Sequence, residues 1–257
     1  METLLKADYA KSYQVGNELF ASHKRQIRSA LRDLVLKDGS LDGATMQTQW
    51  FPQVEADVFI SHSHGDEESV IILAGLLYRM FAIKCFTDTT VWGYGAELLE
   101  ELDKSYCSTG KPGSYSYSLR NVSTSHVYLM LAGALSKMID NTECIFFLNS
   151  PSSIIPSQVM DATLSPWLYF EVLTSQLVRK KLPKEHARRL RAIEKSFSDT
   201  EPELINESFS MTHTVELGHL TPLELDKKFY KIWQDKSQGN VFKLDALYKI
   251  RPEKHFV

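Results

Sequence analysis

The sequence predicts an α/β fold with a mostly parallel central sheet. Short apolar runs at 57–61, 83–87 and 144–150 have the length and composition of buried strands. Longer segments between them repeat apolar residues every three or four positions, as amphipathic helices do. Strand and helix alternate from 57 to 235, which favours parallel strands joined by helices. Together these features predict a flavodoxin-like three-layer sandwich, preceded by an N-terminal accessory helix.

Composition narrows the class of protein. The chain has 257 residues, of which 43% are apolar and 24% charged, as in an ordinary globular domain with an accessory part. The net charge is −3 and there is no long basic block, so nucleic acid is not expected as a direct partner. Three widely spaced cysteines predict neither a disulfide framework nor a zinc site. Without a signal peptide or membrane-spanning run, the expected location is the cytoplasm, with no membrane contact.

Residues 1–55 are expected to form a helical extension and connector. Residues 3–37 predict one helix, which the Asp-Gly pairs at 38–39 and 42–43 end. This helix lies outside any strand–helix–strand unit, so it is expected to pack on the domain or on a second subunit. Residues 44–55 are interpreted as a connector held to the domain by Trp50 and Phe51.

The main domain is assigned to 56–238. Its first half contains elements expected at the following ranges: strand 57–61, helix 67–81 with Asp66 and Glu67 as capping acids, strand 83–87, a glycine-containing loop at 88–95, helix 96–104, an inserted loop at 105–125, helix 127–139 and strand 144–150. The loop at 105–125 is predicted because Ser, Tyr, Gly and Thr replace the apolar period there. Strand 144–150 is the most apolar run and is expected to be central.

The second half begins with an irregular stretch at 151–164. Ser165 followed by Pro166 predicts a helix start, with serine as the cap and proline in the first turn. Further elements are expected as helix 183–197, strand 209–217 and helix 221–233, and the tail 239–257 is expected to add a strand at 240–244.

Glu171 is the strongest candidate for a catalytic residue. With about 100° per residue, Val178 falls near 20°, Glu171 near 40° and Leu168 near 100° when Trp167 is set at zero. The acid therefore lies inside the apolar arc of its helix. An unpaired buried charge is too costly, so such an acid is neutralised, paired or lining a cleft. It is either a functional group or a glutamate bonded to a nearby amide or open to water.

Several motifs resemble a Toll/interleukin-1 receptor (TIR) domain of the bacterial NAD-cleaving type. Asp57-Val58-Phe59-Ile60-Ser61 resembles its opening strand, and the loop at 88–95 stands where the loop after its second strand stands. Trp167 and, four residues later, Glu171 match the spacing of its catalytic helix, with Ser165 in the usual Ser-x-Trp context. A strand ending in Ser150 is similar too, and the resemblance covers roughly 56–235. The insertion at 105–125, the long 151–164 stretch and the lack of a clear fifth strand depart from the pattern.

The resemblance implies an NAD+ glycohydrolase or cyclase that releases nicotinamide, with NAD as substrate and no cofactor. The leaving group departs neutral and needs no proton, so one carboxylate, Glu171, is enough to hold the ribose and stabilise the cationic transition state. Water then gives ADP-ribose, and an internal nucleophile gives a cyclic product. By resemblance the protein acts in antiviral defence or cell-death signalling, associates with itself through TIR surfaces and works with a defence-system partner protein.

The other candidate site residues are expected to bind NAD. Phe59 and Trp167 are candidates to stack on nicotinamide, although Trp167 is equally expected in the core. Ser61 and His62 offer donors to ribose or phosphate, and Trp92, on the 88–95 loop, either closes over substrate or contacts a neighbouring subunit. No third ligand of suitable spacing accompanies His62 and His64, so no metal is expected.

Two other functions remain open from the sequence. One is a non-enzymatic TIR module for protein–protein interaction, in which Glu171 is structural. The other is a related nucleoside transferase, which also uses a glutamate near a ribose.

Overall fold

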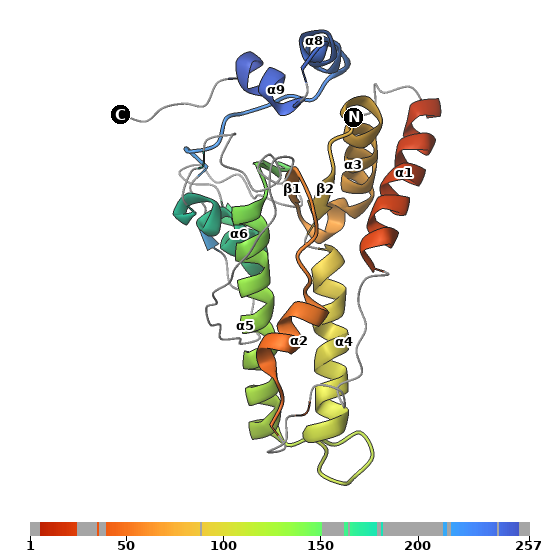
Figure 1. Ribbon diagram of the computed structural model, residues 1–257. Coiled ribbons are helices and arrows are strands. Elements are labelled where there is room, and N and C mark those ends of the chain that lie inside the picture. The colour runs from red at the N-terminus through yellow and green to blue at the C-terminus, as the bar shows by residue number, and fades with distance from the viewer. Residues whose placement is uncertain are drawn as a thin grey trace.

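The computed structural model describes residues 6–24, 35, 40–87, 89–150, 162–163, 165–178, 181, 213–214, 217–240 and 242–251. Within them, a central sheet contains three parallel strands, β1 (Val58–Ser61), β2 (Cys85–Thr87) and β3 (Cys144–Phe147). The order is β2-β1-β3, and Val58 is in register with both Cys85 and Cys144. The expectation that the strand at 144–150 is central is therefore wrong for the described sheet: β1 is central, and β3 lies at the edge with half-buried residues. The predicted α/β fold with a mostly parallel sheet is confirmed (Figure 1).

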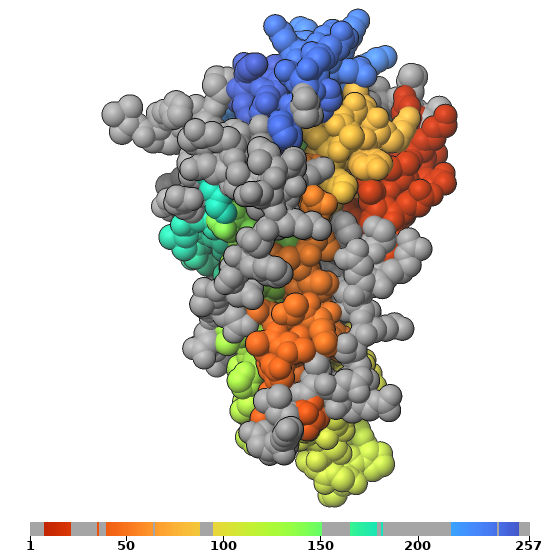
Figure 2. Space-filling model, in the orientation of Figure 1, coloured from red at the N-terminus to blue at the C-terminus, as the bar shows by residue number. Residues whose placement is uncertain are grey.

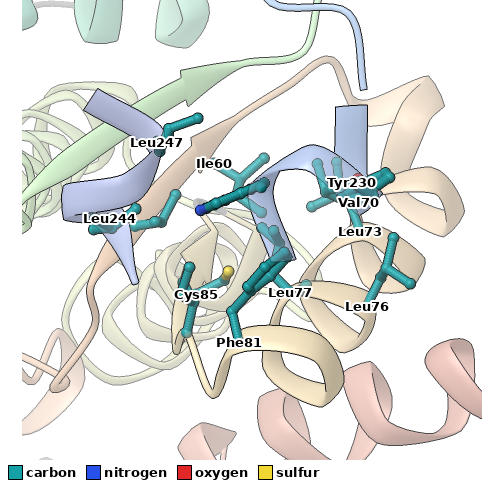
Figure 3. Close-up of a cluster of buried hydrophobic side chains, with 14 of the residues drawn as sticks. Ile60, Val70, Leu73, Leu76, Leu77, Phe81, Cys85, Tyr230, Leu244 and Leu247 are labelled. Atoms are coloured by element: carbon teal, nitrogen blue, oxygen red, sulfur yellow. The ribbon is translucent and has the colours of Figure 1, made fainter. Parts of the chain in front are cut away.

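One face of the sheet packs on helices from the beginning and from the end of the domain's sequence. These are α3 (Glu67–Phe81), α8 (Lys227–Ser237) and α9 (Leu244–Ile250). Figure 3 shows Ile60 and Cys85 among leucines of α3 and α9. Trp233 of α8 is fully buried, stacks on Phe81 with ring centroids 4.2 Å apart and donates its indole N–H to the Lys243 carbonyl.

The other face packs on helices α2 (Gly43–Trp50), α4 (Thr89–Tyr106), α5 (Tyr117–Asn141) and α6 (Pro166–Leu177). Phe59, Phe86 and Ile145 point to this side, because side chains alternate along each strand. The sheet therefore lies between two helical layers, which is the three-layer arrangement that the sequence predicts.

Helix α1 (Lys6–Lys24) packs along α3 (Figure 1). The two backbones approach closely at a glycine of each helix: a Cβ atom on Gly16 would lie 2.0 Å from the Ile71 carbonyl oxygen, and one on Gly75 would lie 1.8 Å from that of Ser12. At the edge of this contact, the Arg79 guanidinium donates to the Ser12 hydroxyl at 2.8 Å. The expectation that an N-terminal helix packs on the domain is confirmed.

The connector expected at 44–55 is partly wrong, because 43–50 form helix α2. Asp42 caps it by accepting the amide N–H of Thr45, and the Thr45 hydroxyl and amide lower the pKa of Asp42. Trp50 and Phe51 are buried, as expected. The helix expected at 3–37 ends before Val35, which pairs with Leu41 in an isolated bridge.

The loops expected at 88–95 and 105–125 are wrong over most of their length. Helix α4 begins at Thr89 and includes Gly95, which is buried and faces Leu131 of α5. Helix α5 begins at Tyr117, with Ser116 as its cap, so that only a turn at 107–116 separates the two helices. The two helices form one long hairpin, and the polar residues of 117–125 face outward. The start of α5 is therefore stabilised by its packing against α4, because its own sequence has no apolar period there.

The C-terminal expectations also change. The last predicted helix begins at Lys227, not 221, because Asp226 caps it by accepting the Phe229 amide N–H at 2.6 Å. The strand expected at 240–244 is wrong at its described residues, 240 and 242–244, and 244–250 form helix α9. Of the strand expected at 209–217, His213–Thr214 (β5) is described and pairs antiparallel with Ala162–Thr163 (β4). The helix expected at 183–197 lies outside the described residues.

In the described part of the chain, no helix combines the length and apolarity required to cross a membrane.

Candidate functional site

The candidate site lies at the carboxyl end of the central strand β1, where ligands bind in open parallel sheets. Ser61 ends this strand, and the polar turn 62–66 leads from it into α3. The segment that follows the neighbouring strand β3 leads to Ser150, and in it the Leu148 amide donates to the Ser61 carbonyl at 2.9 Å. Helix α6 brings Glu171 to the same edge of the sheet.

Local sequence rules explain how α6 presents Glu171. The Ser165 hydroxyl accepts the amide N–H of Leu168 at 3.2 Å, and Pro166 occupies the first turn, as predicted. The buried face of the helix holds Leu168, Glu171, Val172 and Thr174. Glu171 has no exposed surface, so the prediction that it lies on the apolar face is confirmed.

Ser61 and Glu171 form the central contact of the site. The Ser61 hydroxyl donates to Oε2 of Glu171 at 2.5 Å, and both side chains are fully buried. A buried carboxyl group costs less free energy to keep in the fold with this partner than it would without a hydrogen bond. Because Ser61 is fixed by sheet bonds to β3, it fixes the orientation of the carboxylate as well. The sequence indicated both residues but not their bond.

A second pair ties the two loops of this edge together. The Ser150 hydroxyl donates to Oδ2 of Asp66 at 2.5 Å, which joins the segment after β3 to the turn before α3. Asp66 stands at the cap position of α3, as expected, but the expectation of a capping bond is wrong, because its side chain makes none there. Its carboxylate instead accepts the Ser150 hydroxyl and so holds the polar turn 62–66 to the segment after β3.

The predicted NAD-binding residues lie in different environments. Phe59 is fully buried, with its ring centroid 5.6 Å from that of Phe86. His62 is buried, with Nδ1 at 3.4 Å from the Ile60 carbonyl oxygen. Trp167 is half-buried between Tyr128 and Phe170, at centroid distances of 5.9 and 6.2 Å.

The backbone of Trp92 belongs to α4, so the flexible loop expected around it is absent there. Its side chain lies outside the described residues, and the contacts proposed for it stay a prediction. Nothing tests the ligand contacts expected of Phe59, Ser61, His62 and Trp167 either.

A serine–histidine pair that the sequence did not indicate lies on the far side of α6. The Ser175 hydroxyl is 3.0 Å from Nε2 of His219, and Nε2 of Gln176 is 3.3 Å from its Nδ1. The Ser175 hydroxyl also donates to the Val172 carbonyl at 2.6 Å. This pair attaches the segment at 217–220 to α6.

The described ranges contain no group of three His, Cys, Asp or Glu side chains arranged to hold a metal ion.

Comparison with protein-family models finds no match to this chain, and neither the curated proteins nor the solved structures contain a match. The resemblance to TIR domains therefore rests on the residues quoted from the sequence.

Proposed function

We propose that this protein cleaves the bond between nicotinamide and ribose in NAD+, with Glu171 as the catalytic carboxylate. The observation that carries the proposal is the Ser61–Glu171 contact, a fully buried carboxylate held at the carboxyl end of the central parallel strand. Burial of an acid is costly, and acids kept in such positions are candidates for function. The spacing of Trp167 and Glu171 and the TIR-like opening strand add independent support from the sequence.

The reaction needs one negative group beside the ribose. The bond from C1′ to the pyridinium nitrogen breaks, and its electron pair leaves with nicotinamide, which becomes neutral. Positive charge then develops on the ribose, where the Glu171 carboxylate stabilises it by proximity in a medium of low dielectric constant. Attack by water at C1′, with loss of a proton, gives ADP-ribose, and attack by an internal nucleophile of the same molecule gives a cyclic product.

Ser61 takes a different role in this proposal from the one expected on sequence alone. Its only hydroxyl proton is given to Oε2 of Glu171, so it positions the carboxylate. Since Ser61, His62 and Glu171 are all buried, the proposal includes a rearrangement that opens this edge of the sheet to substrate. Activation by self-association would provide such a step.

The test is release of nicotinamide from NAD+ at high protein concentration, followed by chromatography. Glu171→Gln should lower the rate at least about a hundredfold, because it removes the charge and keeps the side-chain size. Glu143→Gln is the matched control, since Glu143 accepts from Tyr248 at 3.1 Å, and Cys144, the next residue, opens β3 at its amino end. This control should keep the wild-type rate.

Ser61→Ala adds a second arm to the same assay. It leaves the carboxylate charged but unfixed, so kcat should fall while thermal unfolding changes less than it does in Glu171→Gln. Wild-type rates in Glu171→Gln would overturn the assignment. An inactive wild type would favour the interaction module, and release of base from free nucleosides would favour the transferase.

A further inference from the structure

The connections that leave β1 and β3 diverge at the carboxyl end of the sheet. After β1 the chain passes through the turn 62–66 into α3, which packs on one face. The segment after β3 leads to α6, which packs on the other face. In open parallel sheets, ligands bind between neighbouring strands whose connections leave toward opposite faces. Because β1 and β3 are neighbours, the turn 62–66 and the segment 148–150 form the two sides of this switch point.

A hydrogen bond between side chains crosses the switch point. The Ser150 hydroxyl, on the segment after β3, donates to Oδ2 of Asp66, on the turn after β1, at 2.5 Å. Both residues are half-buried, whereas Ser61 and Glu171 at the same edge have no exposed surface. A substrate that approaches from solvent therefore meets the accessible pair before the buried one. The two sides of the switch point cannot separate while Ser150 remains bonded to Asp66.

The groups in this bond are suited to exchange with a sugar. Asp66 accepts a hydroxyl in the closed state, and a ribose offers hydroxyls of the same kind. Replacement of the Ser150 hydroxyl by a ribose hydroxyl conserves the number of hydrogen bonds that the carboxylate accepts. The exchange therefore avoids the cost of leaving a half-buried acceptor without a donor.

We propose that Ser150 and Asp66 form a latch across the switch point, which opens when a ribose hydroxyl of the substrate takes the place of Ser150 on Asp66. The inference rests on the proposed function, because the ribose is that of NAD+. A closed latch reduces the fraction of molecules that can bind, and the apparent affinity falls by the same fraction. Asp66 is then a substrate-binding residue, whereas the sequence indicated only a helix cap.

The two sides of the latch give opposite predictions in the nicotinamide assay. Ser150→Ala removes the competing donor and keeps the acceptor, so KM for NAD+ should fall at least about threefold. Asp66→Ala also opens the latch but removes the acceptor, so KM should rise at least about tenfold. In both variants kcat should stay within about twofold of the wild type, because Ser61 and Glu171 are unchanged. A purely structural bond would move both variants in one direction, so KM shifts of the same sign would overturn the proposal.

Ser123→Ala is the matched control. The Ser123 hydroxyl also donates to an aspartate, Asp103, at 3.1 Å. This pair joins α4 to α5 toward the end of the hairpin, which Figure 2 shows in yellow-green at the bottom of the molecule, away from the sheet (Figure 1). Its loss should leave KM unchanged. A fall in KM equal to that of Ser150→Ala would mean that the switch point has no special role.

Hydrogen exchange without substrate tests the latch separately from the reaction. The Asp66 amide donates to the Ser63 carbonyl at 2.8 Å within the turn. In Ser150→Ala, exchange at the amides of 62–66 should accelerate at least about threefold, while exchange in α1 stays unchanged. Unchanged exchange in the turn would overturn the latch, even if Asp66→Ala does not fold. A wild type that releases no nicotinamide would overturn the proposed function, and the exchange rates would still decide whether the latch exists.

Discussion

Two helix pairs in this protein are joined in opposite ways. Helices α1 and α3 meet backbone to backbone at Gly16 and Gly75, where no side chain fits between them. Helices α4 and α5 meet through side chains, with the buried Asp103 network at one end and apolar residues left outside. The difference indicates that the α1–α3 contact depends on the absence of side chains at two positions, whereas the α4–α5 contact depends on the bonds that particular side chains make.

The largest effect is expected from a methyl group in the α1–α3 contact. Gly75→Ala would place a carbon 1.8 Å from the Ser12 carbonyl oxygen, and a backbone atom cannot move aside as a flexible side chain can. The helices must separate, so unfolding in denaturant should show a loss of about 2–4 kcal/mol.

Gly43→Ala is the control for that change. Gly43 also lies in a helix, but a Cβ atom there meets nothing within 4 Å. Its stability should equal that of the wild type or exceed it slightly, because alanine favours the helix. A Gly75→Ala protein as stable as the Gly43→Ala protein would contradict the close approach of α1 and α3.

A smaller effect is expected in the hairpin. Asp103→Asn removes the charge that Arg120 pairs with, and because the Arg120 side chain is half exposed, the loss should be about 1–2 kcal/mol. Hydrogen exchange should accelerate at the amides of 104–122 and not in α1. Glu101→Gln, an exposed acid on the same helix, serves as control. Equal losses in the two variants would mean that the Asp103 network adds no stability.

The smallest change concerns the rates at which two buried thiols react. Burial raises the pKa of the Cys85 thiol and that of the Cys107 thiol, so both are poor nucleophiles at neutral pH in the folded protein. Cys85 belongs to β2 and is buried in the core between the sheet and α3, so it should react only on global unfolding. Cys107 is the first residue of the turn at 107–116 and should react through local opening of that end of the hairpin.

The measurement is labelling by a thiol reagent in a Cys144→Ser background, followed by peptide mapping. Asp103→Asn should accelerate labelling of Cys107 severalfold without changing Cys85. Labelling of both thiols at one rate would show that the turn at 107–116 opens only when the whole protein unfolds.

The sequence was sufficient where local chemistry decides the structure. Helix α3 has the bounds expected of it, 67–81, because its apolar period is continuous. Ser165 and Pro166 start α6 as expected, and the helical wheel placed Glu171 on the buried face correctly.

Prediction from the sequence failed where contacts between residues far apart in the sequence determine the structure. Gly95 was interpreted as part of a loop, yet it lies inside α4, where its lack of a side chain suits the contact with Leu131. The polar stretch 117–125 is helical because Ser116 caps it and Arg120 and Ser123 reach Asp103. The bond between Ser61 and Glu171 spans 110 positions, and no local pattern contains it.

The position of Trp233 has a consequence for how the chain folds during synthesis. This residue completes the core over β1 and α3, which are translated long before it. Until α8 and α9 leave the ribosome, Phe81 and the apolar side of β1 lack part of their cover. A nascent chain therefore exposes apolar side chains, which favour aggregation, for most of its synthesis. Its folding depends on late, long-range contacts that form slowly. We expect this protein to need chaperone assistance in proportion to the time that translation takes to reach Trp233.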